Sequence, residues 1–193
     1  DEWEMENGDL LVLTEDPGYE TVEDVIVLID RKSGEIKKTW DLKDCLVPGE
    51  GPSGGYTPKD WFHNNALWYD SHTNSITLSG RHVDAIINID YDTGKLNWIL
   101  GDPETWPEDK QKYFFAIKGE GDFDWPYEQH GCLVTPNGGI MCFDNGHYRS
   151  KIRERFLLNK DSFSRGVLYR IDREEMTIEQ LWQYGKERGE EFF

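Results

Sequence analysis

The stretch VIVLID at residues 25–30, followed by Ser33-Gly34 and Trp40, decides the fold because its pattern returns twice along the chain. The second copy is IINID at residues 86–90, with Thr93-Gly94 and Trp98, and the third is VLYRID at residues 167–172, which leads to Trp182. In each copy an apolar run ends at an aspartate that can cap a tight turn, and in two copies a glycine supplies a positive φ. Each copy therefore predicts a β-hairpin, and the recurrence predicts a repeat architecture.

A second set of hairpins lies between these copies. The motif DWFH at residues 60–63 opens the first of them, and the motif YEQH at residues 127–130 opens the second. Aligning His63 with His130 brings Arg81 close to Arg149, at offsets of 18 and 19 residues. The inner hairpins therefore repeat as the outer ones do.

Together the two sets predict an all-β protein, a β-propeller fragment that belongs to one domain over residues 1–193. We expect two full four-stranded blades at 60–101 and 128–185, a partial blade at 9–42, and an insertion at 102–127. A closed propeller needs at least four blades, so these blades form only part of a ring. The expected partners are the remainder of the propeller or a second chain, with a homo-oligomer as one form of the latter.

The composition excludes several classes of partner. The chain has 193 residues with 38 acidic and 21 basic side chains, and its net charge of -17 argues against binding to nucleic acid or to an anionic membrane. No apolar run approaches the roughly 20 residues of a membrane span, and the first residues lack the pattern of a signal peptide. Aromatic residues make up 13% of the chain, which indicates a packed core and not a disordered chain.

The predicted strands bring histidine and arginine side chains to one place. Because paired strands run antiparallel, His63 and Arg81 should emerge on the same face of the ring, and His130 and Arg149 should do so one blade later. Arginine matches the geometry of phosphate, sulfate or carboxylate, and histidine can donate or relay a proton near neutral pH. This set predicts an oxyanion site. The alternative is a zinc or iron site at His63, His82 and His130, which the adjacent arginines would oppose.

At these positions the chain resembles the bacterial arylsulfate sulfotransferases. The resemblance rests on DWFHNN at residues 60–65, LSGRH at 78–82, NWILG at 97–101, YEQH at 127–130, FDNG at 143–146 with Arg149, and YGKERG at 184–189. It implies a six-bladed propeller, exported to the periplasm, which moves a sulfuryl group from a phenolic sulfate ester to an acceptor phenol without a nucleotide donor or another cofactor. It implies a route through a sulfated histidine.

The resemblance also implies the site residues. The catalytic positions fall on His63, His130 and Arg149, and the substrate-binding positions on Arg81, His82 and Asn65, with no metal. The nucleophilic histidine of the family follows the last of these motifs and has no counterpart among the five histidines here. We therefore expect that this fragment alone does not turn over. The alternative from another class is a non-catalytic propeller module that binds a ligand or partner.

Two further features have open interpretations. The side chains of Tyr113, Phe114 and Phe115 in the insertion could stack on an aryl ring or could simply pack in the core. Cys132 faces Cys142 across the predicted hairpin, so this pair could form a disulfide or remain as two buried thiols.

Overall fold

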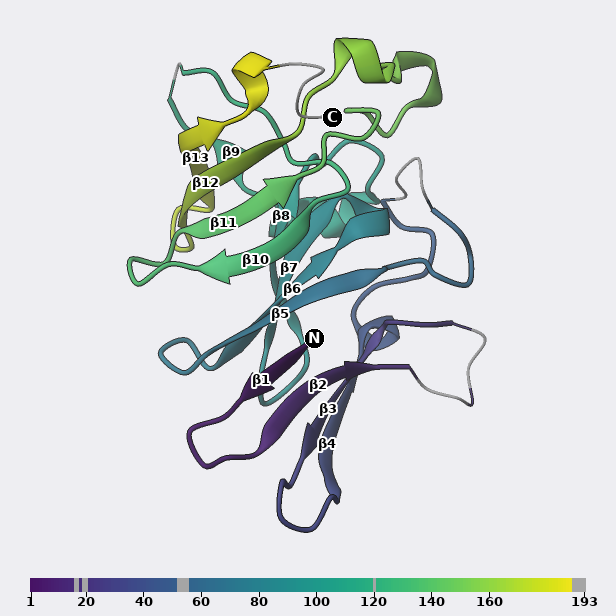
Figure 1. Ribbon diagram of the computed structural model, residues 1–193, viewed down its shortest axis with the longest axis vertical. Coiled ribbons are helices and arrows are strands. Elements are labelled where there is room, and N and C mark those ends of the chain that lie inside the picture. Colours follow the sequence, from purple (N-terminus) through teal and green to yellow (C-terminus); the bar gives the residue numbers. More distant parts are fainter. Residues whose placement is uncertain (16–17, 19–20, 52–55, 120, 189–193) are drawn as a thin grey trace.

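The computed structural model describes residues 1–15, 18, 21–51, 56–119 and 121–188, and these form three consecutive sheets. Figure 1 shows the sheets following one another along the long axis of the molecule. The first sheet has the order β1 (Glu2–Glu4), β2 (Leu10–Thr14), β3 (Val25–Ile29) and β4 (Ile36–Asp41). The second has the order β5 (Asn64–Asp70), β6 (Ser75–Gly80), β7 (Ala85–Asp90) and β8 (Leu96–Gly101). All neighbouring strands in these two sheets are antiparallel.

The third sheet repeats the meander and gains one strand. Its antiparallel part comprises β10 (His130–Val134), β11 (Ile140–Asp144), β12 (Arg165–Asp172) and β13 (Thr177–Tyr184). The short β9 (Ala116–Ile117) pairs with β13 in parallel, so the insertion at 102–127 adds an edge strand to the sheet that follows it. The helical elements of the described residues are 3-10 turns: η1 (Leu42–Asp44), η2 (Arg81–Val83), η3 (Glu108–Tyr113), η4 (Arg153–Arg155) and η5 (Asn159–Asp161).

The predicted all-β fold is confirmed, with one extension in the first sheet. Strand β1 lies outside the segment 9–42 where the sequence pattern predicts only part of a blade. Its three residues are too few to display alternation, and it is recognisable only by its pairing with β2. None of the helices among the described residues is long and apolar enough to cross a membrane.

The hairpin turns form as the sequence pattern predicts. Asp30 accepts hydrogen bonds from the amides of Lys32 and Ser33, and Asp172 accepts from those of Glu174 and Glu175. Gly34 and Gly94 have φ values of 75° and 69°. In the third copy, which has no glycine, Met176 occupies the equivalent position with φ 50°. The turn therefore keeps its left-handed residue at some conformational cost.

The core consists of two layers between facing sheets. Leu11, Ile26 and Trp40 of the first sheet pack with Leu78 and Ile87 of the second. The other face of the second sheet contributes Ile86 and Trp98 to a cluster with residues of the third sheet, namely Cys132, Ile140, Cys142, Val167 and Tyr169. The first strands of the sheets also contact one another in chain order, β1 with β5 and β5 with β10.

This packing decides the interpretation of the cysteines, Phe114 and Phe115, while Tyr113 is only partly buried against the first cluster. All three cysteines are free thiols, with Cys132 and Cys142 buried in the second cluster. Burial raises the pKa of the Cys132 thiol well above its usual range. Phe114 packs against Trp106, and Phe115 packs against Trp98, both as core residues.

One face of the third sheet has no neighbour in the described part of the chain. It carries large apolar side chains that are 38–48% exposed: Leu133, Met141, Phe143, Trp182 and Tyr184. The strand pairing places Met141 beside Leu168 and Leu168 beside Trp182, so these residues form one stripe across the sheet. We call this surface the open face.

Candidate active site

The DWFH segment is held in place by its two central side chains. Trp61 and Phe62 are fully buried, and the indole Nε1 of Trp61 donates a hydrogen bond of 2.7 Å to the buried Asp24 Oδ2. These anchors leave the flanking Asp60 and His63 only partly buried. His63 has φ 51°, a strained value for a non-glycine residue that often marks functional positions.

The predicted pairing of His63 with Arg81 is confirmed by the backbone. The amide of Arg81 donates to the carbonyl of His63 at 3.1 Å, and the amide of His82 donates to the carbonyl of Phe62 at 3.1 Å. The backbone of Arg81 and His82 in η2 is therefore paired with the DWFH segment.

Asp60 connects two histidines. Its Oδ2 lies 2.6 Å from His63 Nδ1, and its backbone carbonyl lies 2.6 Å from His82 Nδ1. The two imidazole rings have centroids 4.6 Å apart. Potential ligand atoms of Asp60, His63 and His82 lie within 4.8 Å of one another, but the hydrogen bond of 2.6 Å engages Asp60 Oδ2 and His63 Nδ1 with each other. This group differs from the three-histidine alternative because Asp60 replaces His130.

Arg81 points away from the sheet that carries it. Its Nε and Nη2 donate to Glu128 Oε2 of the following motif at 3.1 and 2.9 Å. Glu128 is buried, has φ 46°, and its amide donates to Asp84 Oδ1 at 2.6 Å. Its other oxygen, Oε1, has no hydrogen-bond partner among the described residues. The ion pair links the second sheet to the third.

Two amide side chains also link the second sheet to the third. Gln129 is fully buried, and its Nε2 lies 3.0–3.2 Å from Ser79 Oγ, the Gly80 carbonyl and the Ala85 carbonyl. Asn65 donates to the carbonyl of Gln129 at 2.8 Å and accepts from the amide of Gly131 at 3.3 Å. The structure therefore places Asn65 in contact with backbone groups of the third sheet.

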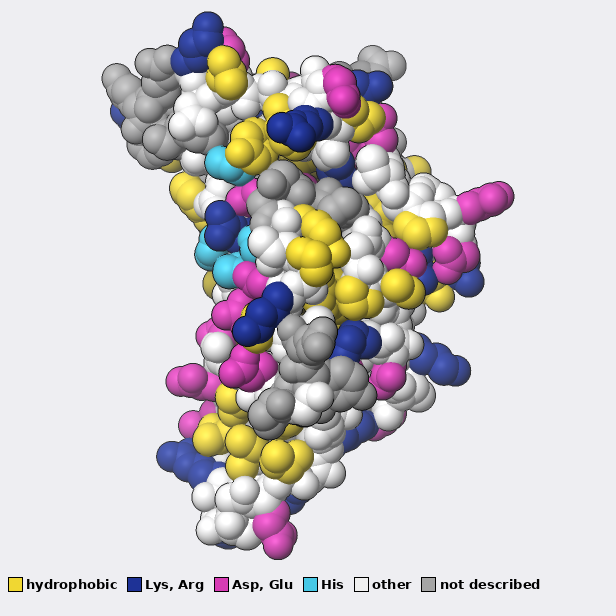
Figure 2. Space-filling model, turned by 90° about the vertical axis from the view of Figure 1, so that its right-hand side faces the viewer, with side chains coloured by type: hydrophobic (Ala, Val, Ile, Leu, Met, Phe, Trp, Pro, Cys, Tyr) yellow, Lys and Arg dark blue, Asp and Glu magenta, His cyan; other side chains and the backbone are white. Residues whose placement is uncertain are grey.

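His130 lies exposed beside these groups. Its Nδ1 is 3.0 Å from Asn145 Nδ2. Burial of part of the ring lowers the pKa of His130, and the positive charge of Arg81 and the nearby His63 lower it further. Figure 2 shows histidine side chains gathered along one edge of the molecule with basic and acidic side chains around them.

A groove of about 500 Å³ begins at His130 and runs along the first strands of the sheets. Its lining is mainly apolar and includes Trp3, Trp68, Leu133, Met141 and Phe143. A planar apolar group would find complementary surface here.

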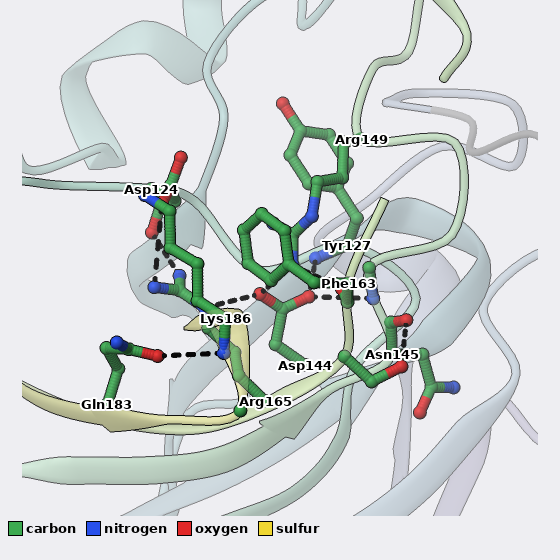
Figure 3. Close-up of polar contacts among 12 residues, drawn as sticks. Asp124, Tyr127, Asp144, Asn145, Arg149, Phe163, Arg165, Gln183 and Lys186 are labelled. Carbon is green, nitrogen blue, oxygen red and sulfur yellow. Dashed lines mark hydrogen bonds and ion pairs between the residues drawn. The ribbon is translucent and has the colours of Figure 1, made fainter. Parts of the chain in front are cut away.

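The guanidinium of Arg149 is held by Asp144 and by the segment that contains Phe163. Its Nη2 donates to Asp144 Oδ2 at 3.0 Å and to the carbonyl of Phe163 at 2.7 Å, and its guanidinium carbon lies 3.4 Å from the centroid of the Phe163 ring. Figure 3 shows Arg149 and Arg165 on the two sides of Asp144. The Nε and Nη1 atoms of Arg149 are buried and have no hydrogen-bond partner within the described part of the chain. Arg149 thus retains donors for another acceptor.

The equivalence of Arg149 with Arg81 does not extend to the backbone. The hydrogen bond that corresponds to Arg81–His63 joins the amide of Gly146 to the carbonyl of Tyr127 at 3.0 Å, and His130 is paired with Phe143. Arg149 follows in a loop, where Tyr148 and Arg149 have φ values of 57° and 46°. The similar offsets therefore describe two different local structures.

The sequence patterns did not reveal the acidic partners of the site. Asp60, Glu128 and Asp144 each hold one of the predicted site residues, and the buried Arg165 shares Asp144 with Arg149. The first three lie inside the very motifs that were quoted, but nothing in their spacing distinguishes them from solvated carboxylates. The structure brings Asp60, His63, Arg81, His82 and His130 together, while Arg149 pairs with Asp144.

Comparisons with known proteins identify the family of the chain. A family model described as arylsulfotransferase (ASST) matches residues 1–193. The chain is 29% identical to the arylsulfate sulfotransferase AssT of Escherichia coli O6:H1 and 31% identical to that of Lelliottia amnigena, in each case over 90% of this chain and 36% of the relative. The chain therefore spans about a third of the length of the curated relatives that it matches. On the match over its whole length, the chain belongs to the arylsulfotransferase family.

Proposed function

We propose that this chain supplies the oxyanion-binding and acid–base part of an arylsulfate sulfotransferase. The enzyme would transfer a sulfuryl group from a phenolic sulfate ester to an acceptor phenol through a sulfated histidine located outside this chain. The observation that carries the proposal is the buried guanidinium of Arg149, whose Nε and Nη1 have no partner among the described residues. The names of both relatives support the class of reaction.

The chemistry of sulfuryl transfer suits these side chains. A loose transition state, as in phosphoryl transfer, places negative charge on the peripheral oxygens, and fixed donors stabilise it. We assign this role to Arg149, with Arg81 as a second positive charge. A phenolate is a poor leaving group because phenol has a pKa near 10, so proton delivery by His63 or His130 would assist its departure.

The groove beside His130 supports an aromatic substrate. Its apolar lining, with Trp3 of the first sheet and Trp68 of the second, would hold the aryl ring while the sulfate faces the histidines. The core positions of Phe114 and Phe115 remove them from this role. His82 and Asn65 would act next to the substrate or by fixing the site. His82 contacts the segment that carries His63, and Asn65 contacts the segment that carries His130.

We also propose that the rest of the ring, or a second chain, covers the open face and brings the nucleophilic histidine. The exposed apolar stripe and the 36% share of the relatives support this. The isolated chain would then be inactive. We propose export to the periplasm on the resemblance of the motifs alone.

One observation favours a different function. Arg81 and Asn65 are both engaged in contacts between sheets, as in a propeller module that only binds a ligand or partner. The two functions predict different effects on turnover when Arg149 or His130 is replaced.

The test uses a full-length preparation that includes the nucleophilic histidine, with p-nitrophenyl sulfate as donor and phenol as acceptor. We expect phenol-dependent release of nitrophenol, and a loss of about 10²–10³-fold in kcat for Arg149→Ala and His130→Ala. The matched control is Arg170→Ala, because Arg170 is exposed and pairs with Glu179 in the hairpin of the third sheet. Phenol-independent binding without turnover would favour the binding module.

A further inference from the structure

The hydrogen-bond partners of His63 determine which ring nitrogen carries its proton. Nδ1 lies 2.6 Å from Asp60 Oδ2 and 3.4 Å from Glu23 Oε2. Ionised carboxylates only accept hydrogen bonds, so Nδ1 must be the protonated nitrogen. In the neutral ring, Nε2 of His63 is then left with a free lone pair.

The partner of His130 sets the opposite pattern. Its Nδ1 lies 3.0 Å from Asn145 Nδ2, and an amide nitrogen only donates. Nδ1 therefore accepts, and the proton of the neutral ring is on Nε2. The adjacent charge of Arg81 and partial burial favour the uncharged form.

We infer that Asp60 and Asn145 are positioning residues that give His63 and His130 opposite tautomers and different tasks. His63 is the proton shuttle, and His130 is a neutral hydrogen-bond donor. The inference rests on the proposed function, which leaves open which histidine moves the proton. It also explains why the two motifs carry different partners for otherwise similar histidines.

The proton balance closes over one cycle. In the first half-reaction the bond between sulfur and the aryl oxygen breaks, the nucleophilic histidine receives the sulfuryl group, and protonated His63 gives its Nε2 proton to the departing phenolate. In the second half-reaction neutral His63 takes the proton of the acceptor phenol at Nε2, and the phenol oxygen bonds to sulfur. Asp60 stabilises the imidazolium form of His63. His130 donates one hydrogen bond throughout and transfers no proton, because a neutral imidazole is too weak an acid.

Asp60 supports this arrangement from a fixed place. It follows Lys59 directly before the buried Trp61, and its backbone carbonyl accepts from His82 Nδ1 at 2.6 Å. His82 packs against the ring of His63 with centroids 4.6 Å apart. The ring of His63 is therefore held by a hydrogen bond at its edge and a neighbour at its face.

The test measures the ring ¹⁵N shifts of the 193-residue chain at about pH 9, above the ordinary histidine pKa of about 6.5. We expect the Nδ1–H form for His63 and the Nε2–H form for His130. Asp60→Ala should move His63 towards a mixture of tautomers and leave His130 unchanged. Asn145→Asp should switch His130 to the Nδ1–H form, because the new carboxylate accepts a proton from Nδ1.

The control is Asp70→Asn, since Asp70 lies 3.5 Å from the exposed His72 and caps the turn at the opposite end of the β5–β6 hairpin from His63. It should change neither tautomer. His63 in the Nε2–H form, or no response of His130 to Asn145→Asp, would overturn the inference. If Asp60→Ala does not fold, the wild-type spectrum still tests His63 and Asn145→Asp still tests His130, because Asn145 is only partly buried, directly after β11 and beside His130.

Activity separates this inference from the proposed function. In the full-length preparation, Asp60→Ala should lower kcat about 10²-fold, and Asp60→Glu should recover part of the loss. Sulfuryl transfer by a protein with the wrong tautomer at His63 refutes the inference alone. The expected tautomers in a protein that transfers no sulfuryl group refute the proposed function.

Discussion

Asp144 balances two buried guanidinium groups with one carboxylate. Its Oδ2 accepts from Arg149 Nη2 at 3.0 Å and from Arg165 Nε at 2.9 Å, while its Oδ1 accepts from the amides of Tyr127 and Gly146 at 3.0 and 2.9 Å. The carboxylate is fully buried, so water cannot replace these partners. The position of Arg149 depends on it.

Asp144→Asn should therefore destabilise the protein by about 3–5 kcal/mol, because two buried cations lose their shared countercharge. Urea unfolding followed by tryptophan fluorescence measures the change. Asp172→Asn is the control, since Asp172 accepts two backbone hydrogen bonds in an exposed turn, and it should cost about 1 kcal/mol or less. Equal losses for both variants would contradict the shared role of Asp144.

Asn65 was predicted to bind substrate, and its contacts suggest a test that separates this role from a structural one. The side chain bonds the carbonyl of Gln129 and the amide of Gly131. Asn65→Ala should cost about 1–3 kcal/mol, because two backbone groups lose a partner. A change in substrate KM in the full-length preparation with no change in the free energy of unfolding would instead indicate direct binding.

At the scale of elements, the turn after η2 and the loop after β11 meet through a buried pair, Asp84 and Lys151. Burial raises the pKa of Asp84 to about 7 and lowers the pKa of Lys151 to about 8, and each charge partly offsets the effect on the other. Lys151 donates to the Val83 carbonyl at 2.9 Å, and Asp84 accepts from the Glu128 amide at 2.6 Å. The pair therefore lies directly behind the Arg81–Glu128 contact.

The sign of the pH dependence follows from these directions. Because the pKa of Asp84 is raised in the folded protein, Asp84 favours folding most when it is protonated, below its unfolded pKa of about 3.9. This contribution to the free energy of unfolding is lost as the pH rises to about 7. The lowered pKa of Lys151 means that its penalty is largest below pH 8 and fades as the pH rises towards 10.

The combined penalty is thus largest between pH 7 and 8. The double variant Asp84→Asn/Lys151→Met removes this penalty, so its free energy of unfolding should exceed that of the wild type most near pH 7.5. The gain near pH 7.5 should be larger than the gain at pH 5 by on the order of 1–3 kcal/mol. Urea unfolding at three pH values measures the difference between variant and wild type. A difference that does not vary with pH would contradict the shifted pKa values.

The hairpins were predictable because their signals are local. Aspartate caps at Asp30, Asp90 and Asp172 and the apolar runs before them determine strand, turn and face within about ten residues of sequence. The place of His63 opposite Arg81 followed from the same turn geometry. Strand β1 was not predicted because three residues are too few to show the alternation of a strand, and it is defined by its pairing with β2.

The electrostatic part of the site was not predictable from spacing. Glu128 reaches Arg81 across 47 positions, and Arg165 reaches Asp144 across 21. The first pair depends on how the second sheet packs against the third, and the second pair depends on the register of β11 with β12, which places Asp144 opposite Arg165. The repeat also misled at Arg149, since an offset that differs by one residue places the arginine in a strained loop and not beside the strand.

At the scale of the molecule, the open face is an apolar stripe on a strongly acidic chain. Met141 and Trp182 of this stripe are 38% and 46% exposed, and an exposed apolar surface of this kind is typical of an interaction site. The net charge of -17 opposes contact between copies.

We therefore expect salt-dependent self-association of the isolated chain. Raising the salt concentration screens the repulsion and should increase the apparent mass in sedimentation experiments. Met141→Lys/Trp182→Lys should keep the chain monomeric at the same salt concentration. Leu158→Lys is the control, because Leu158 is 64% exposed in the loop before η5 and outside the open face. An unchanged mass in all three proteins at every salt concentration would show that the face does not associate.

The side chain of Gln129 also has a consequence for the order of folding. Its Nε2 contacts three acceptors near the turn between β6 and β7, and that turn must be complete before these acceptors are in place. Each sheet, by contrast, is a meander that closes through nearby residues and forms quickly. The third sheet can therefore dock only after the second sheet has formed. During synthesis on the ribosome, the sheets would then fold one at a time in sequence order, and each new sheet would pack on a sheet that is already folded.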